Sequence, residues 1–204
     1  MTGINPLNAA RVSHAEGFMF FNAGEARALD AMTARIVPSA PDGLGAREAG
    51  VVAYIDRSVA GYFRDLQGIY RVGLQHLDDY CHAGRGRTFA DLSALEQDDV
   101  LASLDRTGTD RTTPEQAAAK LPADVREMLL ARFFAVVREH TIQGMFCDPI
   151  YDGNCNFIGW KLIGFPGAQW GYSAEQMQEG FDATTIPILS LSDLQRARTG
   201  SSND

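Results

Sequence analysis

Apolar residues recur at helical spacing in the first part of the chain. Asn22 and Glu25 form a capping-box pattern, in which the Asn side chain and the Glu carboxylate each accept a hydrogen bond from a backbone N–H. We therefore expect a helix to begin here, and Pro38 is expected to end it because the residue before a proline is biased away from α geometry. The apolar face between these signals consists of Leu29, Met32 and Ile36.

A longer apolar stripe follows between Arg47 and Gly84. Its members are Val51, Val52, Ile55, Val59, Tyr62, Leu66, Ile69, Tyr70, Leu74 and Leu77. This spacing predicts two helices, or one helix that bends near Gly61.

Two further helices are predicted in the second half of the chain. Ser93 and Glu96 form a second capping box, which predicts a short helix to about Arg106. Its apolar face consists of Leu95, Val100, Leu101 and Leu104. Pro122 suits the first turn of another helix because its φ angle is already fixed near the helical value. The apolar face of that helix consists of Val125, Met128, Leu129, Phe133, Val136, Val137 and His140.

The two-residue alternation that marks a half-buried strand is nearly absent, apart from the run TTIPILSL at residues 184–191. We therefore predict an all-α fold, an irregular helical domain of about five to seven helices with a long Gly- and aromatic-rich loop segment near the C-terminus. The expected organisation is an N-terminal arm over residues 1–20, a helical domain over 21–172 that includes the loop 144–167, and a C-terminal extension over 173–204 with a frayed tail.

The loop segment 144–167 differs in amino-acid composition from the rest of the chain. Its sequence is GMFCDPIYDGNCNFIGWKLIGFPG. Its five glycines and two prolines argue against long regular elements. Its aromatic side chains are Phe146, Tyr151, Phe157, Trp160 and Phe165. Two interpretations are open: rigid aromatic side chains anchor an interface with another protein, or they cap the helical core.

Composition and charge exclude several classes of partner. The 204 residues carry a net charge of −8, and the basic residues are scattered, so nucleic acid is not an expected partner. No apolar run approaches the ~18 residues that a membrane-spanning helix needs. The N-terminal sequence lacks a basic head followed by an apolar stretch, and the chain contains no Arg-Arg pair, so no export signal is predicted.

No catalytic or metal-binding pattern stands out. The histidines are scattered, and a free-standing helical enzyme such as a hydrolase that uses His76 or His140 remains the competing interpretation. Asp152, Asn154 and Asn156 imitate the first ligands of a calcium loop, but Asx turns in a Gly-rich segment explain them better.

The three cysteines, Cys81, Cys147 and Cys155, do not decide the redox compartment. In an oxidising compartment, a short disulfide between Cys147 and Cys155 is a further hypothesis.

The loop segment resembles part of the gluconate 2-dehydrogenase subunit 3 family, in which Asp-Pro, Tyr, Gly-Asn, Gly-Trp and Ile-Gly-x-Pro-Gly follow a helix in that order. The corresponding residues are Asp148, Pro149, Tyr151, Gly153, Asn154, Gly159, Trp160, Ile163, Gly164, Pro166 and Gly167. A second stretch, GAREAGVVAYIDRSV at 45–59, is similar to the same family's Gly-Ala-x-Glu-Ala-Gly-Val-x-x-Tyr-Ile-Asp. The likeness extends from about Phe21 to Gly171, and Asp152 replaces a glycine that is usual in the family.

The resemblance implies a non-catalytic, gamma-type small subunit of a bacterial sugar or polyol dehydrogenase. The implied partner is a large FAD-containing subunit of the glucose-methanol-choline class, with or without an iron–sulfur cluster, which passes electrons to a cytochrome c subunit or another acceptor. The small subunit itself binds no cofactor; it supports the folding of the large subunit and can aid its export. The family resemblance places the complex in the periplasm, whereas the missing export signal leaves the cytoplasm as the alternative.

The resemblance and the aromatic loop together indicate which residues contact the partner. The expected contacts are Asp148, Pro149, Tyr151, Asn154, Trp160, Phe165 and Pro166. On this hypothesis Trp160→Ala weakens association more than it unfolds the chain. On the alternative, in which Trp160 fills the core, the same substitution destabilises the isolated chain.

Overall fold

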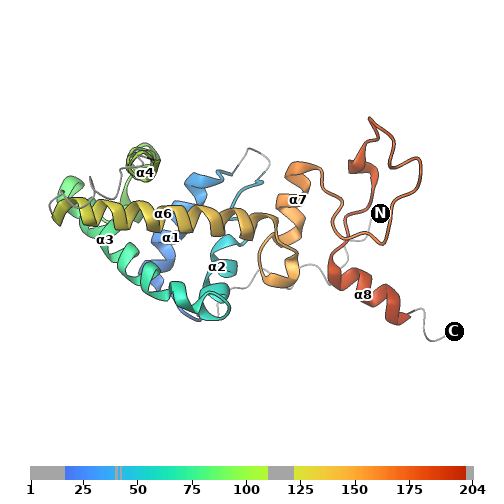
Figure 1. The fold of residues 1–204 in the computed structure, drawn as a ribbon, viewed down its shortest axis with the longest axis horizontal. Helices are drawn as coiled ribbons and strands as arrows, with labels where there is room; N and C mark the ends of the chain where they lie inside the picture. Colours follow the sequence, from blue (N-terminus) through green and yellow to red (C-terminus); the bar gives the residue numbers. More distant parts are fainter. Residues whose placement is uncertain (1–16, 40, 42, 110–121, 201–204) are drawn as a thin grey trace, which may run out of the picture.

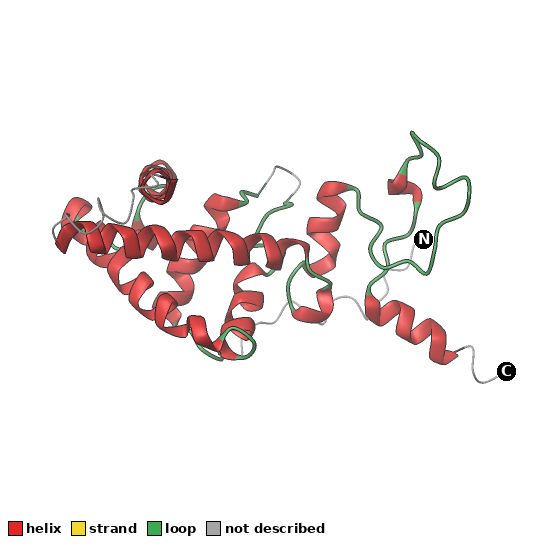
Figure 2. Cartoon of the chain, viewed as in Figure 1, coloured by secondary structure: helices red, strands yellow, loops and turns green. Residues whose placement is uncertain are grey.

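The computed structural model describes residues 17–39, 41, 43–109 and 122–200. Within these ranges the chain forms seven α-helices joined by short 3-10 turns and loops, and it has no β-strand (Figure 2). The prediction of an all-α fold of five to seven helices is confirmed. The alternating run at 184–191 begins in a 3-10 turn, Ala183–Thr185, and its β-type pairing is an isolated parallel bridge between Gly167 and Leu189.

The longest helix, α6, forms the axis of the helical body. The helices are α1 (Ala23–Ile36), α2 (Val51–Ala60), α3 (Gln67–Arg85), α4 (Ala94–Thr109), α6 (Pro122–Phe146), α7 (Ile158–Ile163) and α8 (Leu191–Gly200). Helix α6 contacts α1, α2, α3 and α4, and α7 packs near its C-terminal end (Figure 1). Helix α8 lies at the far end of the molecule, beyond α7.

Both predicted capping boxes are present. The Asn22 side chain accepts from the Glu25 N–H, and the Glu25 carboxylate accepts from the Asn22 N–H, each at 2.9 Å. The Glu96 carboxylate accepts from the Ser93 N–H at 2.8 Å and from its hydroxyl at 2.7 Å. These bonds satisfy N–H groups that have no partner inside a helix, so α1 and α4 begin where the sequence predicts.

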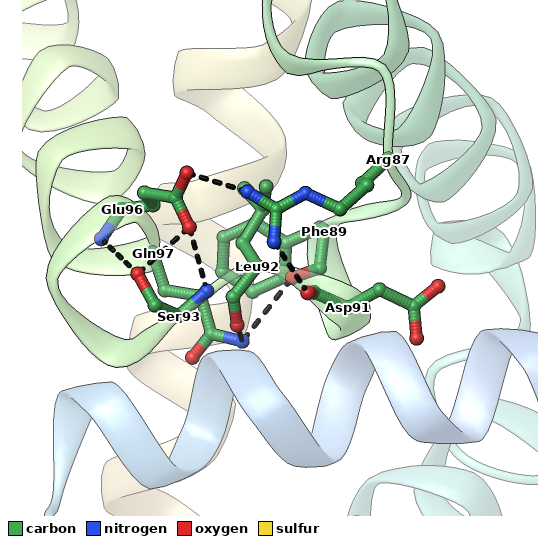
Figure 3. A network of polar contacts seen from close by, with 7 residues as sticks. All are labelled: Arg87, Phe89, Asp91, Leu92, Ser93, Glu96 and Gln97. Carbon is green, nitrogen blue, oxygen red and sulfur yellow. Dashed lines mark hydrogen bonds and ion pairs between the residues drawn. The ribbon is translucent and has the colours of Figure 1, made fainter.

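The start of α4 is also held by a wider polar network (Figure 3). Arg87 pairs with the Glu96 carboxylate at 2.7 Å, and the buried Gln97 amide donates to the Phe89 and Leu92 carbonyls at 3.1 Å each. The Gln97 hydrogen bonds contribute more to stability than the ion pair does, because they satisfy buried carbonyls whereas the ion pair is partly screened by solvent.

The predicted break near Gly61 is confirmed, because α2 ends at Ala60 and α3 begins at Gln67 after a 3-10 turn, Arg64–Leu66. The predicted apolar stripes are wrong at Leu95 on α4, which is 78% exposed, and at two further places. Tyr62 lies in the break and is 89% exposed, since the helix that would have turned it inward has already ended.

The last error falls at the start of α6, where Val125, Met128 and Leu129 are exposed. The predicted Phe133, Val137 and His140 are buried, and Leu130 completes the buried face of this helix.

The chain before α1 is attached to α2 by one carboxylate. Asp56 is buried and accepts from the backbone N–H groups of Met19, Phe20 and Phe21 at 2.6, 2.9 and 2.9 Å. Most of the arm predicted over residues 1–20 lies outside the described residues, but its last residues are thus fixed to the helical body. At the other end, residues 198–200, which the sequence predicts to fray, form the last turn of α8, and 201–204 lie outside the described residues.

Candidate functional site

The segment 144–167 is a series of short helical turns rather than an irregular loop. Helix α6 continues through Gly144 to Phe146, and it is followed by two 3-10 turns, Pro149–Tyr151 and Cys155–Phe157, and by α7. The sequence predicts a long loop over this segment, whereas the structure forms these short helical elements. Four non-glycine residues here have positive φ: Asp152 and Asn154 lie between the two 3-10 turns, and Asn156 and Phe157 lie within the second one. Asp and Asn tolerate this left-handed region better than most side chains, so Asp152 and Asn154 can reverse the chain here without a glycine.

Asn154 joins the turns from within. It is fully buried, its amide nitrogen donates to the Cys147 carbonyl at 2.9 Å, and its amide oxygen accepts from the Gly159 N–H at 2.8 Å. Its own N–H donates to the Gly144 carbonyl at 2.8 Å. These bonds support the interpretation of the Asp/Asn run as turn residues, and no group of three or more His, Cys, Asp or Glu side chains among the described residues is arranged to hold a metal ion.

Trp160 is also an interior residue. Only 5% of it is exposed, its indole Nε1–H donates to the Phe146 carbonyl at 2.8 Å, and its ring stacks on Phe157 with centroids 5.7 Å apart. Phe165 meets the same ring edge-on at 5.3 Å. The burial agrees with the second interpretation of Trp160, in which it stabilises the chain itself.

The seven residues expected to contact a partner therefore fall into two groups. Asn154, Trp160 and Pro166 are buried within this chain, so another protein could reach them only if the segment rearranged. Tyr151 and Phe165 are exposed, and Asp148 and Pro149 are half-buried. The carboxylate of Asp148 accepts from the Ile150 N–H at 3.0 Å and from the Leu191 N–H at 2.8 Å, so it holds both the turn below Tyr151 and the start of α8.

The two stretches that carry the family resemblance meet in space. The Cys155 N–H donates to the Ala49 carbonyl at 3.0 Å, and the Arg57 guanidinium pairs with the Asp152 carboxylate at 2.6 Å. The ion pair is partly exposed and contributes little stability by itself, but the backbone bond fixes the distance between the two segments.

A largely apolar pocket of about 600 Å³ opens at this junction. It is lined by Tyr54 and Ser58 of α2, by Tyr62 and Phe63, by Ile142, Gln143 and Phe146 of α6, and by Cys147 and Tyr151. The Tyr54 hydroxyl donates to the Gln143 side-chain oxygen at 3.1 Å. Tyr151 is 57% exposed, so it and Tyr62 stand at the surface with much of their rings in water.

Five of the nine lining residues lie in the two motif stretches, but the sequence does not predict that they form a pocket. The predicted apolar stripe places Tyr62 in the core, and the predicted stripes do not include Phe63 or Ile142. The signal that could have found Tyr62 and Phe63 is the break at Gly61, because aromatic residues directly after a helix end are not constrained to its buried face.

Neither Cys81 nor Cys147 has the lowered pKa of a nucleophilic thiol. Burial raises the pKa of the Cys147 thiol to about 11 and that of Cys81 to about 11, so both are protonated at neutral pH. The Cys147 thiol lies 3.6 Å from the Gly144 carbonyl oxygen, to which it donates. The structure has Cys147 and Cys155 as thiols and does not contain the disulfide considered above.

The two histidines of the competing hydrolase hypothesis do not line the pocket. His140 is buried, with its Nδ1 2.8 Å from the Tyr70 hydroxyl and its ring stacked on Phe63 at 4.5 Å between centroids. His76 lies on α3, with its Nδ1 4.0 Å from an Asp79 carboxylate oxygen. The surroundings of His140 are those of a structural histidine.

The buried position of His140 leads to an expected pH dependence. Burial lowers the pKa of its imidazole below the usual 6.5, so below that pH the unfolded chain binds a proton here that the folded chain does not. We expect the free energy of unfolding to fall as the pH is lowered through about 6.5, by up to about 1.4 kcal/mol per pH unit from this group. Denaturant titrations of the wild type and His140→Gln between neutral and mildly acidic pH would measure it. Equal slopes for the two chains would contradict the assignment.

Fold and site together define an all-α protein that offers an aromatic pocket at the junction of two sequence motifs. Comparison with known families matches residues 23–167, well over half of the chain, to the family described as Gluconate 2-dehydrogenase subunit 3. The chain belongs to the gluconate 2-dehydrogenase subunit 3 family, as its motifs indicated, and this membership makes it a subunit of a multi-subunit dehydrogenase. No significant match was found among curated proteins or solved structures. None of the described helices is both long and apolar enough to cross a membrane.

Proposed function

We propose that the chain is the non-catalytic small subunit of a heteromeric FAD-dependent sugar or polyol dehydrogenase, which binds and stabilises the large flavin subunit. The observation that carries this proposal is the position of the pocket. Both stretches that define the family contribute to its walls, through Tyr54 and Ser58 on one side and Cys147 and Tyr151 on the other. A surface built from both shared motifs is where a shared partner would bind.

The chemistry of the pocket favours binding over catalysis. Its lining residues are mainly aromatic and aliphatic, and they include no histidine, carboxylate, lysine or arginine. The polar Tyr54 and Gln143 side chains bond to each other, and Cys147 is a protonated thiol. Exposed Tyr62 and Tyr151 at the mouth are the residue type that most often anchors protein interfaces, because their rings bury a large area with little loss of rotamer freedom.

The remaining parts of the proposal rest on the family. FAD, with or without an iron–sulfur cluster, belongs to the large subunit of the glucose-methanol-choline class, and a cytochrome c subunit or another acceptor takes its electrons. The small subunit aids the folding and export of its partner, so the proposed location of the complex is the periplasm. Fractionation of cells that express both subunits tests the location, and recovery of the complex in the cytoplasm would support the alternative.

Substitution in the pocket tests the proposed function. We expect the chain to co-elute with a FAD-containing subunit of the gluconate 2-dehydrogenase type on a sizing column. Tyr151→Ala should weaken this association by about 2 to 4 kcal/mol, on the order of 30- to 1,000-fold, because a central aromatic anchor is lost. A titration of the flavin subunit with each variant gives the affinity.

Leu95→Ala, which removes an exposed apolar side chain from α4, is the matched control and should bind like the wild type. Failure of the wild-type pair to associate would contradict the proposed function. Sugar oxidation by the isolated chain with an artificial electron acceptor would contradict its non-catalytic part.

A further inference from the structure

Residues 168–190 form a closed loop outside the region that matches the family. The Ala168 N–H donates to the Leu189 carbonyl at 2.7 Å, and the Leu189 N–H donates to the Pro166 carbonyl at 3.2 Å. The Gln169 amide nitrogen joins the same two segments, because it donates to the Pro166 carbonyl at 2.8 Å and to the Pro187 carbonyl at 3.0 Å. The ends of the loop are thus held together beside α7, and the residues between them project away from the helical body (Figure 1). We call residues 168–190 the acidic arm.

The acidic arm holds its shape through its own hydrogen bonds. The Ser173 N–H donates to the Gln176 side-chain oxygen at 2.8 Å, and the Gln176 N–H donates back to the Ser173 hydroxyl at 3.2 Å. Further along, the Asp182 carboxylate accepts from the Thr184 N–H at 3.0 Å and from its hydroxyl at 2.6 Å. A loop ordered in this way loses less conformational entropy on binding than a flexible one.

Large apolar side chains on the acidic arm face solvent. Trp170 is 73% exposed and Met177 is 69% exposed, and Tyr172 is exposed as well. Phe181 in the same arm is half-buried. Several exposed residues of this kind on one ordered projection are typical of an interaction surface rather than of a free surface.

The charge of the acidic arm restricts the kind of partner. It carries Glu175, Glu179 and Asp182, and no lysine or arginine occurs between Lys161 and Arg196. This charge repels anionic lipid and nucleic acid, and a second copy of a chain with net charge −8 would be repelled too. Charge complementarity therefore favours a polypeptide that surrounds an apolar pocket with lysine and arginine side chains.

We propose that the acidic arm is a second docking element, which places Trp170 and Met177 in an apolar pocket with a basic rim on the large flavin subunit. This inference rests on the proposed function and extends it to residues outside the shared family region. Because the family match ends at Gly167, the acidic arm lies outside the region that the family has in common. It therefore contributes to the choice of one large subunit over others, whereas the aromatic pocket serves the contact that the family has in common.

Two double variants test the acidic arm, with a FAD-containing subunit of the gluconate 2-dehydrogenase type as the probe. Trp170→Ser/Met177→Ser should weaken association at least about 30-fold, because two apolar anchors are lost. Glu175→Gln/Glu179→Gln should weaken it several-fold at low salt and make the affinity less sensitive to ionic strength. The melting temperature of the isolated chain should change by less than about 2 °C in both, since these side chains lie outside the core.

The outcomes separate the two proposals. If the wild-type pair forms and both double variants bind like the wild type, the acidic arm is not a docking element and the proposed function stands. If the wild-type chain does not bind the flavin subunit, the proposed function fails and this inference fails with it. A large drop in melting temperature, or self-association of the isolated chain that the same variants abolish, would also overturn the assignment of the acidic arm to a flavin-subunit contact.

Discussion

Replacing Trp160 with alanine is expected to lower the free energy of unfolding of the isolated chain by about 3 to 5 kcal/mol. The substitution removes a buried ring that stacks on Phe157 and meets Phe165 edge-on. It also leaves the Phe146 carbonyl without the indole N–H that it accepts at 2.8 Å. A cavity and an unsatisfied carbonyl both destabilise the folded state, and chemical denaturation of the free subunit measures their sum.

The second tryptophan of the chain is the matched control. Trp170 is 73% exposed, so Trp170→Ala should change the free energy of unfolding by no more than about 0.5 kcal/mol. A small effect of Trp160→Ala on stability, together with lost binding to the flavin subunit, would instead favour the hypothesis that Trp160 contacts the partner directly.

Gly159→Ala adds a single methyl group, which is expected to displace α7 from the end of α6. A Cβ atom on Gly159 would lie 1.8 Å from the Met145 carbonyl oxygen and 2.8 Å from its carbonyl carbon. These are backbone atoms of α6, so they cannot move aside as a flexible side chain could. We expect Gly159→Ala to cost about 3 kcal/mol or more, at the upper end of overpacking effects, and thermal melts of the isolated chain would show it.

Gly68→Ala is the control for this substitution. Gly68 is a helical glycine in α3 with no atom within 4 Å of the site of a new Cβ, so alanine there should stabilise the chain by up to about 1 kcal/mol. If both alanine variants proved equally stable, α7 would not be packed on α6 as closely as the structure has it.

These buried residues matter for function because they position exposed ones. Asn154 and Trp160 attach the segment to the end of α6, and Asp148 caps the turn that carries Tyr151 to the mouth of the pocket. A destabilising change inside the segment should therefore also weaken the proposed pairing. Pairing assays are informative only at temperatures where each variant is folded.

Local signals in the sequence were sufficient to predict much of the helical body. The capping boxes at Asn22 and Ser93 and the break near Gly61 depend on residues within one or two turns of each other, so the helix boundaries follow from neighbouring side chains. The family motifs are likewise readable along the chain, and the match over residues 23–167 bears them out.

The tertiary structure decided which aromatic residues pack in the interior of the chain and which face solvent. Trp160 and Tyr151 stand nine positions apart in the same segment, yet one is buried and the other is exposed. The difference arises because the segment packs against Ala49 and Arg57, roughly a hundred residues earlier in the chain, and against the end of α6. Contacts over such separations leave no periodic trace in the sequence, so the pocket, the buried tryptophan and the projecting acidic arm could be found only from the folded chain.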